Sequence, residues 1–300
     1  MTDIGFIGLG NMGGRMTRRL VGAGTRVLGF DPQAGAAEAA GAHPAGSAAQ
    51  LAAESDIVFL SLPDSQVVEA VVLGEEGVIA SARPGTVIVD LSTSAPASTR
   101  RLHDVAWERR VGYLDAGISG GAAAAEAGTL TLMVGGEAEE LEKVRSAMSP
   151  FASNVFHVGG PGAGHTTKLL NNFLNAIALS ATAEVMVAAK KAGLDLATVL
   201  DVFNKSSGVN FATLNRFPKI ITGDYLKGGL TNTLMMKDVV LYTELLSELG
   251  VAGLNAPAPL AAFGLARQLG YADQISNTVV DAIGDISGGI RLHDPEEGEE

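Results

Sequence analysis

The amino-acid sequence predicts an α/β fold, with a doubly wound parallel sheet in the first half and an all-helical second half. Up to about residue 160, short apolar runs rich in β-branched residues alternate with helical patterns. Strands buried on both faces between helices have this pattern. From Gly164 onward the periodicity is helical and no segment reads as a strand. The change predicts two domains, residues 1–161 and 162–292, followed by an acidic disordered tail over 293–300.

The expected elements follow from the positions of these runs. Strands are expected over residues 4–8, 26–30, 56–60, 86–90, 112–115, 129–134 and 154–158. Helices of the first domain are expected over 12–22, 47–54, 65–72, 97–109 and 138–148. Helices of the second domain are expected over 164–192, 196–205, 210–221, 232–249, 257–269 and 273–286. A chain of 300 residues is long enough for two domains, each with its own core.

Composition excludes several classes of function. The net charge of −12 disfavours nucleic-acid binding, which needs cations to neutralise phosphates. The chain has no cysteine, so it has no disulfides or thiolate metal sites, and its five histidines are scattered, so no metal site is expected. The acidic N-terminus does not resemble a signal peptide, and the apolar runs are shorter than a membrane span. A cytoplasmic protein is therefore expected.

A glycine-rich loop follows the first expected strand and opens the first helix. The segment fits the dinucleotide-binding pattern G-x-G-x-x-G with Gly8, Leu9, Gly10, Asn11, Met12 and Gly13. Gly8 permits the tight turn, Gly10 lets the backbone approach a pyrophosphate, and Gly13 allows close packing of helix on strand. The helix N-terminus adds amide groups and a positive dipole. The first domain is therefore predicted to be a Rossmann domain that binds a nicotinamide dinucleotide.

Asp31 ends the second expected strand, near the offset at which such domains place a ribose-binding acid. Its carboxylate can accept bonds from both ribose hydroxyls and would repel a 2′-phosphate. Pro32 and Gln33 follow it, and neither is an arginine that could bind that phosphate. We therefore expect NAD in preference to NADP, although an acid at a strand end is also a common turn residue.

Polar loops also follow the third and fourth expected strands, at the sheet edge where α/β folds bind ligands. Leu62 and Pro63 are expected to wall the cofactor, and Ser92 and Thr93 to hydrogen-bond its ribose or nicotinamide. Taken alone, each of these residues is more often part of a loop or a helix cap than a cofactor contact.

A second glycine cluster, Ser119, Gly120 and Gly121, follows the strand expected to end at Asp115. A serine hydroxyl and nearby backbone N–H groups, with no side chains to block the approach, suit a small carboxylate. An ordinary Gly-Gly turn is the alternative interpretation, and the local sequence does not decide between the two.

The segment GAGHTTKLLNNFLNA at 162–176 begins a long apolar helix that carries a lysine and three asparagines. At 3.6 residues per turn, Lys168, Asn172 and Asn175 share one face, with Asn171 at its edge. Such a face can hold the oxygens of a substrate, and a desolvated lysine can transfer a proton. The alternative is a surface lysine on an amphipathic helix.

Five motifs, in order and at familiar spacing, resemble the β-hydroxyacid dehydrogenase family, which includes 3-hydroxyisobutyrate dehydrogenase and tartronate-semialdehyde reductase. They are FIGLGNMG, DLST, SGGAAAAEAGTLTLMVGG, GAGHTTKLLNN and MKD. The resemblance implies a Rossmann domain joined by a long interdomain helix to an all-α domain, with the active site between them. It implies that Lys168 is the catalytic acid and base, and that Asn172 orients the substrate.

The same resemblance implies that Ser119, Gly120 and Gly121 bind the substrate carboxylate. It places Lys237 near both nicotinamide and substrate, with Asp238 supporting it. The expected reaction is reversible hydride transfer between NAD and a small 3-hydroxy acid or its semialdehyde. The broad apolar faces of the second domain predict a homodimer or homotetramer.

The sequence departs from the family pattern at three positions. Gly117 stands where the family usually has proline, Ala124 where it has glycine, and Leu230 where an aromatic is common. These changes suggest a reshaped substrate pocket. Two alternatives remain: an imine or aldehyde reductase on the same scaffold, and a non-catalytic nucleotide-binding protein. Lys168 argues against imine reductases, because they commonly lack a lysine there.

Overall fold

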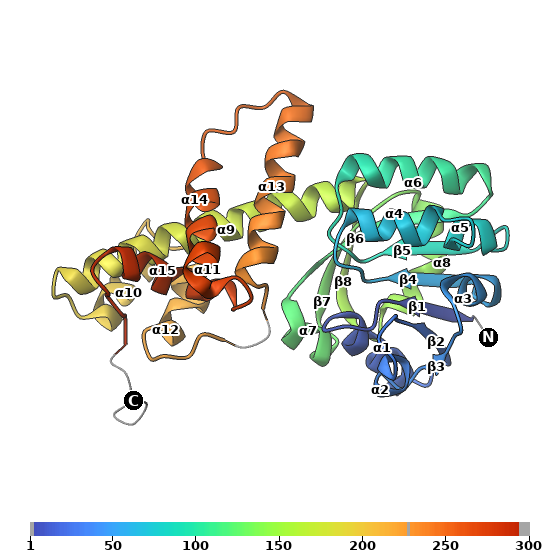
Figure 1. Ribbon diagram of the computed structural model, residues 1–300, viewed down its shortest axis with the longest axis horizontal. Helices are drawn as coiled ribbons and strands as arrows, with labels where there is room; N and C mark the ends of the chain where they lie inside the picture. Colours follow the sequence, from blue (N-terminus) through green and yellow to red (C-terminus); the bar gives the residue numbers. More distant parts are fainter. Residues whose placement is uncertain (1–2, 227–228, 294–300) are drawn as a thin grey trace. The chain divides into compact units, whose positions relative to one another are not determined.

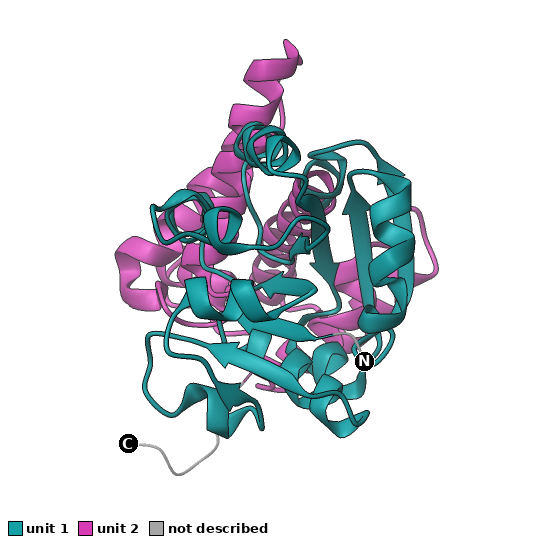
Figure 2. Ribbon diagram, turned by 90° about the vertical axis from the view of Figure 1, so that its right-hand side faces the viewer, with its two compact units in different colours: residues 1–168 teal, residues 169–300 magenta. Residues whose placement is uncertain are grey.

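The computed structural model describes residues 3–226 and 229–293 of the chain (Figure 1). The chain divides into two compact units, Met1–Lys168 (unit 1) and Leu169–Glu300 (unit 2), which Figure 2 colours teal and magenta. Of the predicted acidic tail, only His293 belongs to the described residues.

Unit 1 contains an eight-stranded sheet with strand order β3-β2-β1-β4-β5-β6-β7-β8. Its strands are β1 (Ile4–Ile7), β2 (Val27–Phe30), β3 (His43–Pro44), β4 (Ile57–Leu60), β5 (Val87–Asp90), β6 (Gly112–Ser119), β7 (Leu130–Gly135) and β8 (Ala152–Gly159). The first six run parallel in the order of a dinucleotide-binding fold, while β7 pairs antiparallel with β6. The predicted doubly wound sheet is confirmed, but the sheet is mixed, not purely parallel.

Helices cover both faces of this sheet. They are α1 (Gly13–Gly22), α2 (Ala36–Ala39), α3 (Ala48–Glu54), α4 (Ser65–Leu73), α5 (Val78–Ser81), α6 (Pro96–Glu108), α7 (Gly121–Ala127) and α8 (Ala138–Met148). Alternate strand residues point to opposite faces. Phe6 and Phe59 therefore pack with α1, α7 and α8, whereas Ile7 and Ile88 pack with α3 to α6. The two apolar clusters therefore bury both faces of the sheet.

Unit 2 is helical. Helix α9 (Ala163–Lys191) begins in unit 1 and supplies the central apolar face of unit 2, including Phe173, Leu179 and Met186. The remaining helices are α10 (Leu196–Asn204), α11 (Phe211–Asn215), α12 (Phe217–Ile220), α13 (Asn232–Leu249), α14 (Pro257–Ala266), the π-turn η1 (Arg267–Tyr271), the 3₁₀ turn η2 (Ser276–Thr278) and α15 (Val279–Ile286). Among the described residues of this unit the one β-type pairing is an isolated bridge between Thr231 and Ile275.

Several predicted element boundaries were wrong. The single helix predicted over 210–221 is two helices, because the backbone departs from helical geometry at Arg216 (φ −113°, ψ −58°) and Pro218 lacks an N–H to continue the ladder. The helix predicted over 257–269 ends at Ala266 and continues as a π-turn. Strand β6 extends four residues beyond Asp115, to Ser119. The elements β3, α2, α5 and α7 were not predicted, because they are too short to show a periodicity.

Helix α9 is long and apolar enough, by length and composition, to cross a membrane. Just over half of its most apolar window, 56%, is buried inside the fold. Core helices of folded domains pass the same test, so this single helix is weak evidence for a span.

Candidate active site

The dinucleotide loop in unit 1 has the geometry that its glycines predict. Gly8 has a φ of +88°, and a Cβ at this position would collide with the carbonyl oxygen of Ser61. A Cβ at Gly13 would collide with the carbonyl of Gly8 and touch the Phe6 ring at 3.0 Å. Gly10, in contrast, faces open space. The loop therefore leaves its backbone accessible at the position where a pyrophosphate would approach, so the residues present fit a dinucleotide.

The Asp31 carboxylate fixes the start of this loop. Its two oxygens accept hydrogen bonds from the backbone N–H of Leu9 (2.7 Å) and of Gln33 (2.8 Å). Each carboxylate oxygen has a second lone pair, so Asp31 retains the capacity to accept ribose hydroxyls. Asp31 follows β2, as predicted. Its carboxylate also fixes the dinucleotide loop, a structural role that the sequence did not reveal.

The loops that follow β4 and β5 are hydrogen-bonded to each other at the carboxyl ends of these strands. The Ser92 hydroxyl accepts from the Leu62 N–H at 2.9 Å, and the Ser65 hydroxyl accepts from the Ala95 N–H at 2.8 Å. Ser92 is buried and anchors the neighbouring loop, and its hydroxyl keeps an O–H donor, so its predicted bond to the cofactor stays a prediction. Thr93 is partly buried and Pro63 is exposed.

Behind these loops lies a buried polar network that the sequence did not predict. Asp90 accepts from the Ser92 N–H (2.9 Å), the Ser94 hydroxyl (3.3 Å) and the Tyr113 hydroxyl (3.2 Å). Burial, reinforced by the Asp90 charge, raises the pKa of Tyr113 well above its usual range, so the phenol remains a donor. The network joins the β5 loop to the sheet interior.

His165, in the first turn of α9, lies beside this network. Its Nδ1 lies 2.7 Å from the Thr99 hydroxyl, and its Nε2 lies 4.0 Å from an Asp90 oxygen, too far for a hydrogen bond. The side chain is fully buried. The sequence placed His165 only at a helix start, and no local signal indicated this burial.

Asp115 on β6 holds the N-terminus of α9. Its buried carboxylate accepts from the backbone N–H groups of Gly162 (2.9 Å) and His165 (2.7 Å). A carboxylate at this position satisfies unpaired amides and complements the helix dipole. A Cβ at Gly164 would collide with the carbonyl oxygens of Asp115 and Met133, so the helix begins in direct contact with the sheet.

The same contact places Lys168. A Cβ at Gly117 would lie only 2.5 Å from the Lys168 Cβ, so the lysine stem rests on the bare backbone of β6. Lys168 is only 9% exposed. Because side chains alternate along a strand, Asp115, Gly117 and Ser119 lie on one face of β6. Unit 1 therefore brings Lys168 to the strand that ends at the predicted carboxylate-binding serine.

The Ser119 loop turns sharply into α7. Gly120 (φ +121°) and Gly121 (φ +68°) both have backbone conformations that favour glycine. Ser119 is partly buried, and Gly121 faces open space. The end of β6 thus presents a hydroxyl and, at Gly121, an open backbone, whereas a Cβ at Gly120 would lie 2.6 Å from the Ala124 Cβ.

Unit 2 contains a polar cluster of its own. The Asn172 amide donates to Asp238 Oδ2 at 2.5 Å, and Lys237 Nζ lies 3.3 Å from Asp238 Oδ1. Asp238 is almost completely buried, so it fixes both side chains. The Asn171 amide is exposed and lies 3.5 Å from the Asn172 oxygen. Asn172 occupies the helical turn that follows Lys168 on α9, and Phe173 beside it stacks on Tyr242 with ring centroids 3.9 Å apart.

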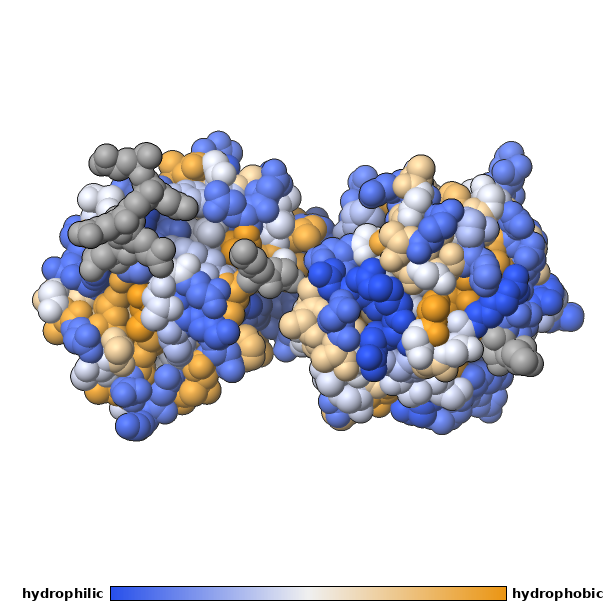
Figure 3. All heavy atoms as spheres, turned by 90° about the horizontal axis from the view of Figure 1, so that it is seen from below, coloured by the Kyte–Doolittle hydropathy of each residue, from blue (hydrophilic) through white to orange (hydrophobic). Residues whose placement is uncertain are grey.

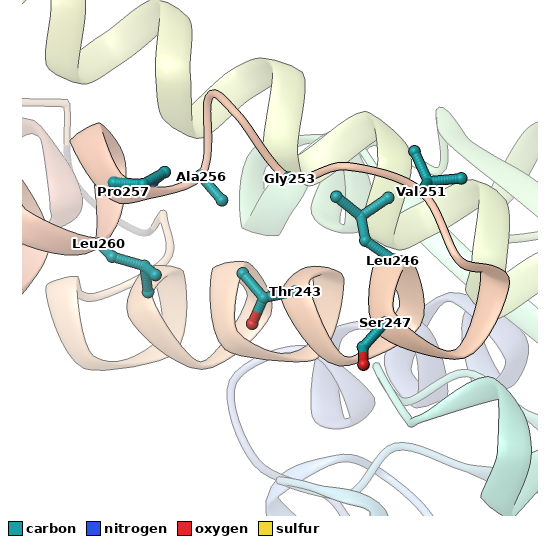
Figure 4. Close-up of a pocket in the computed structure, with 8 residues that line it drawn as sticks. All are labelled: Thr243, Leu246, Ser247, Val251, Gly253, Ala256, Pro257 and Leu260. Atoms are coloured by element: carbon teal, nitrogen blue, oxygen red, sulfur yellow. The ribbon is translucent and has the colours of Figure 1, made fainter.

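A separate cavity in unit 2 contains none of the predicted site residues. It has a volume of about 300 Å³ and lies between α13 and α14 (Figure 4). Apolar side chains and the hydroxyl groups of Thr243 and Ser247 line it. No cluster of three metal-binding side chains occurs within residues 3–226 and 229–293.

Two protein-family models match this chain, one over each of its two halves. Residues 3–159 match the family model described as the NAD-binding domain of 6-phosphogluconate dehydrogenase. Residues 162–281 match the one described as the NAD-binding domain of NADP-dependent 3-hydroxyisobutyrate dehydrogenase.

Individual relatives cover most of the chain. An NAD-dependent L-serine dehydrogenase of Pseudomonas aeruginosa is 38% identical and aligns over 100% of both chains. A 2-(hydroxymethyl)glutarate dehydrogenase of Eubacterium barkeri is 38% identical over 89% of this chain and 87% of its own. The structure of Mycobacterium tuberculosis 3-hydroxyisobutyrate dehydrogenase with L-serine superposes with a TM-score of 0.84, at 32% identity, covering 95% of this chain and 99% of that one.

Proposed function

The chain belongs to the β-hydroxyacid dehydrogenase family, and on that premise we propose that it oxidises the terminal hydroxyl of a small 3-hydroxy acid to the semialdehyde. It is an NAD(P)-binding dehydrogenase that acts on hydroxy acids. The proposal concerns the position of the hydroxyl, the preference for NAD, and the residues that perform the reaction.

The observation that supports it is the burial of Lys168 against β6. In the proposed reaction, the Lys168 amine accepts the hydroxyl proton as the carbinol C–H bond breaks. In reduction, the ammonium returns the proton to the alkoxide and stabilises its charge. NAD, when bound, supplies the hydride acceptor. The low exposure of Lys168 strengthens such a charge interaction, because little water screens it.

The other proposed roles are those that the family resemblance implies. The Ser119 hydroxyl and the Gly120–Gly121 backbone bind the carboxylate, which leaves the carbon chain pointing toward Lys168. Asn172 orients the substrate from the next turn of α9, held by Asp238. Lys237 is proposed to contact both cofactor and substrate, and Asp238 limits its movement through their 3.3 Å ion pair. The dinucleotide loop, Asp31, Leu62, Pro63 and Thr93 hold NAD.

A panel of substrates tests this function. Formation of NADH is measured with L-serine, 3-hydroxyisobutyrate, 2-(hydroxymethyl)glutarate and, as the 2-hydroxy control, lactate. Oxidation of NADH is measured with a cyclic imine. The proposal expects turnover of at least one 3-hydroxy acid and none of lactate or the imine. Turnover restricted to the imine would contradict it and support the imine reductase alternative.

A further inference from the structure

Arg216 in unit 2 is a partly buried cation, and no acidic partner for it occurs among residues 3–226 and 229–293. In the described part of the chain, the bonds of its guanidinium are to two neutral amides: Nη1 donates to Asn277 Oδ1 (2.7 Å) and Nη2 to Asn175 Oδ1 (3.0 Å). Burial alone, with no carboxylate to oppose it, lowers the pKa of Arg216 to about 10. The group still carries its charge at neutral pH.

The bonds of Arg216 leave a surplus of donors. A guanidinium has five N–H groups, and the two amide oxygens occupy two of them. The Asn277 amide donates to the Tyr225 carbonyl at 2.8 Å, which turns its oxygen toward Arg216. The ring of Phe211 lies 5.8 Å from the guanidinium carbon and supports the cation from one side. This cluster of Arg216, Asn175, Asn277 and Phe211 therefore offers a positive charge and N–H donors, and none of its four members is a carboxylate.

A side chain whose only role was to join Asn175 and Asn277 by hydrogen bonds would not need the positive charge of Arg216. Burying a cation with only neutral partners is unfavourable, and it is usually offset by a carboxylate or another anion. The planar fork of arginine matches the two oxygens of a carboxylate. An anionic ligand is therefore the missing partner that the cluster fits best.

The position of the cluster indicates which ligand. Asn175 lies three residues after Asn172 and seven after Lys168, so all three share one face of α9. We propose that Arg216, together with Asn175, binds a second anionic group of the substrate, so that the preferred substrates are hydroxy acids with a distal carboxylate. This inference rests on the proposed function, and its residues all belong to unit 2.

A matched pair of substrates isolates the second charge. 2-(Hydroxymethyl)glutarate has a distal carboxylate where 2-(hydroxymethyl)pentanoate has a methyl group, and the reacting end is the same. Wild-type protein should show a higher kcat/KM for the glutarate. Arg216→Gln should lower kcat/KM for the glutarate by about tenfold or more, as for loss of a charged hydrogen bond, and leave the pentanoate nearly unchanged.

Two further variants serve as a charge control and as a second way to neutralise Arg216. Lys219→Gln removes an exposed charge from the same segment and should change neither value. Asn175→Asp supplies an internal carboxylate to Arg216 and should abolish the preference even where Arg216→Gln does not fold. A sulfonate analogue of the glutarate shows whether the site accepts other oxyanions, because it should be used about as well as the carboxylate.

Equal use of both compounds by the wild type would overturn the inference. Parallel loss of both activities in Arg216→Gln and Asn175→Asp would overturn it as well, because it would assign Arg216 a structural role. Failure of the proposed function has a different signature, since the wild type would then oxidise neither compound nor any other 3-hydroxy acid.

Discussion

At the scale of single residues, the candidate site is built mainly from polar side chains that are buried or partly buried. The sequence singles out Lys168 and Asp31, because each belongs to a motif with fixed spacing, and their roles stay predictions. The sequence does not reveal the contacts of Asp115 and His165, because their partners lie 47 and 66 residues away in the chain. In the sequence, Asp115 is only the last residue of the strand expected over 112–115.

Asp31 is expected to control cofactor choice. Asp31→Asn retains an acceptor for one backbone N–H but loses the charge that repels a 2′-phosphate. The ratio of kcat/KM for NAD over NADP should fall about tenfold, mostly through weaker use of NAD. Steady-state kinetics with both cofactors measure this ratio.

Asp56→Asn is the matched control. Asp56 directly precedes β4, so it lies at the amino-terminal end of the strands, away from the dinucleotide loop. Its carboxylate pairs with Arg83 on the surface at 2.9 Å. An unchanged NAD/NADP ratio in Asp31→Asn would show that this carboxylate does not select the cofactor.

Among secondary-structure elements, the first turn of α9 determines the geometry of the site. Gly117, Gly135 and Gly164 remove side chains where this turn meets β6 and β7, and Asp115 satisfies its amides. The sequence showed the helix and its lysine, but it did not show the strand on which they rest. The absence of a Cβ at Gly117 thus leaves space for the Lys168 stem.

Gly117→Ala tests this contact. The new methyl group would lie 2.5 Å from the Lys168 Cβ, so the lysine must move. A displacement of about 1 Å can lower turnover about 100-fold, so kcat should fall between about 10- and 100-fold while KM for NAD stays constant. Gly160→Ala, where a Cβ meets nothing within 4 Å, should keep the wild-type kcat. A wild-type kcat in Gly117→Ala would show that the position of Lys168 does not depend on β6.

At the scale of the whole molecule, the sequence predicted the fold class because periodicity over long segments averages out local ambiguity. The mixed sheet and the break at Arg216 escaped prediction, since strand direction and a single backbone angle leave little trace in composition. Each unit has its own buried core, with Phe6 and Phe59 in unit 1 and Phe217 and Phe263 in unit 2. The cofactor loop therefore belongs to the unit with the first core, and the Asn172–Asp238 pair to the unit with the second.

Unit 2 also exposes many large apolar side chains. They include Leu194, Val202, Leu214, Leu249, Val251, Leu254 and Ile286, with Leu254 at 85% exposure. Figure 3 shows orange apolar areas among the polar ones on one face of this unit, at the left. Exposed apolar surface of this kind favours association. We propose a homodimer or homotetramer, which light scattering during size-exclusion chromatography should report as two or four times 30.7 kDa. A monomer at micromolar concentration would contradict it.

Single-turnover hydride transfer in Lys168→Ala tests the central claim most directly. The variant is loaded with NAD and a 3-hydroxy acid that the wild type oxidises, and NADH formation is followed in a stopped-flow instrument. The rate should fall at least about 100-fold, the range that general acid–base catalysis contributes, while the affinity for NAD stays within about twofold. Lys143→Ala, which removes an exposed lysine paired with Glu140, should behave like the wild type. A near-normal rate in Lys168→Ala would contradict the assignment of Lys168 as the catalytic acid and base.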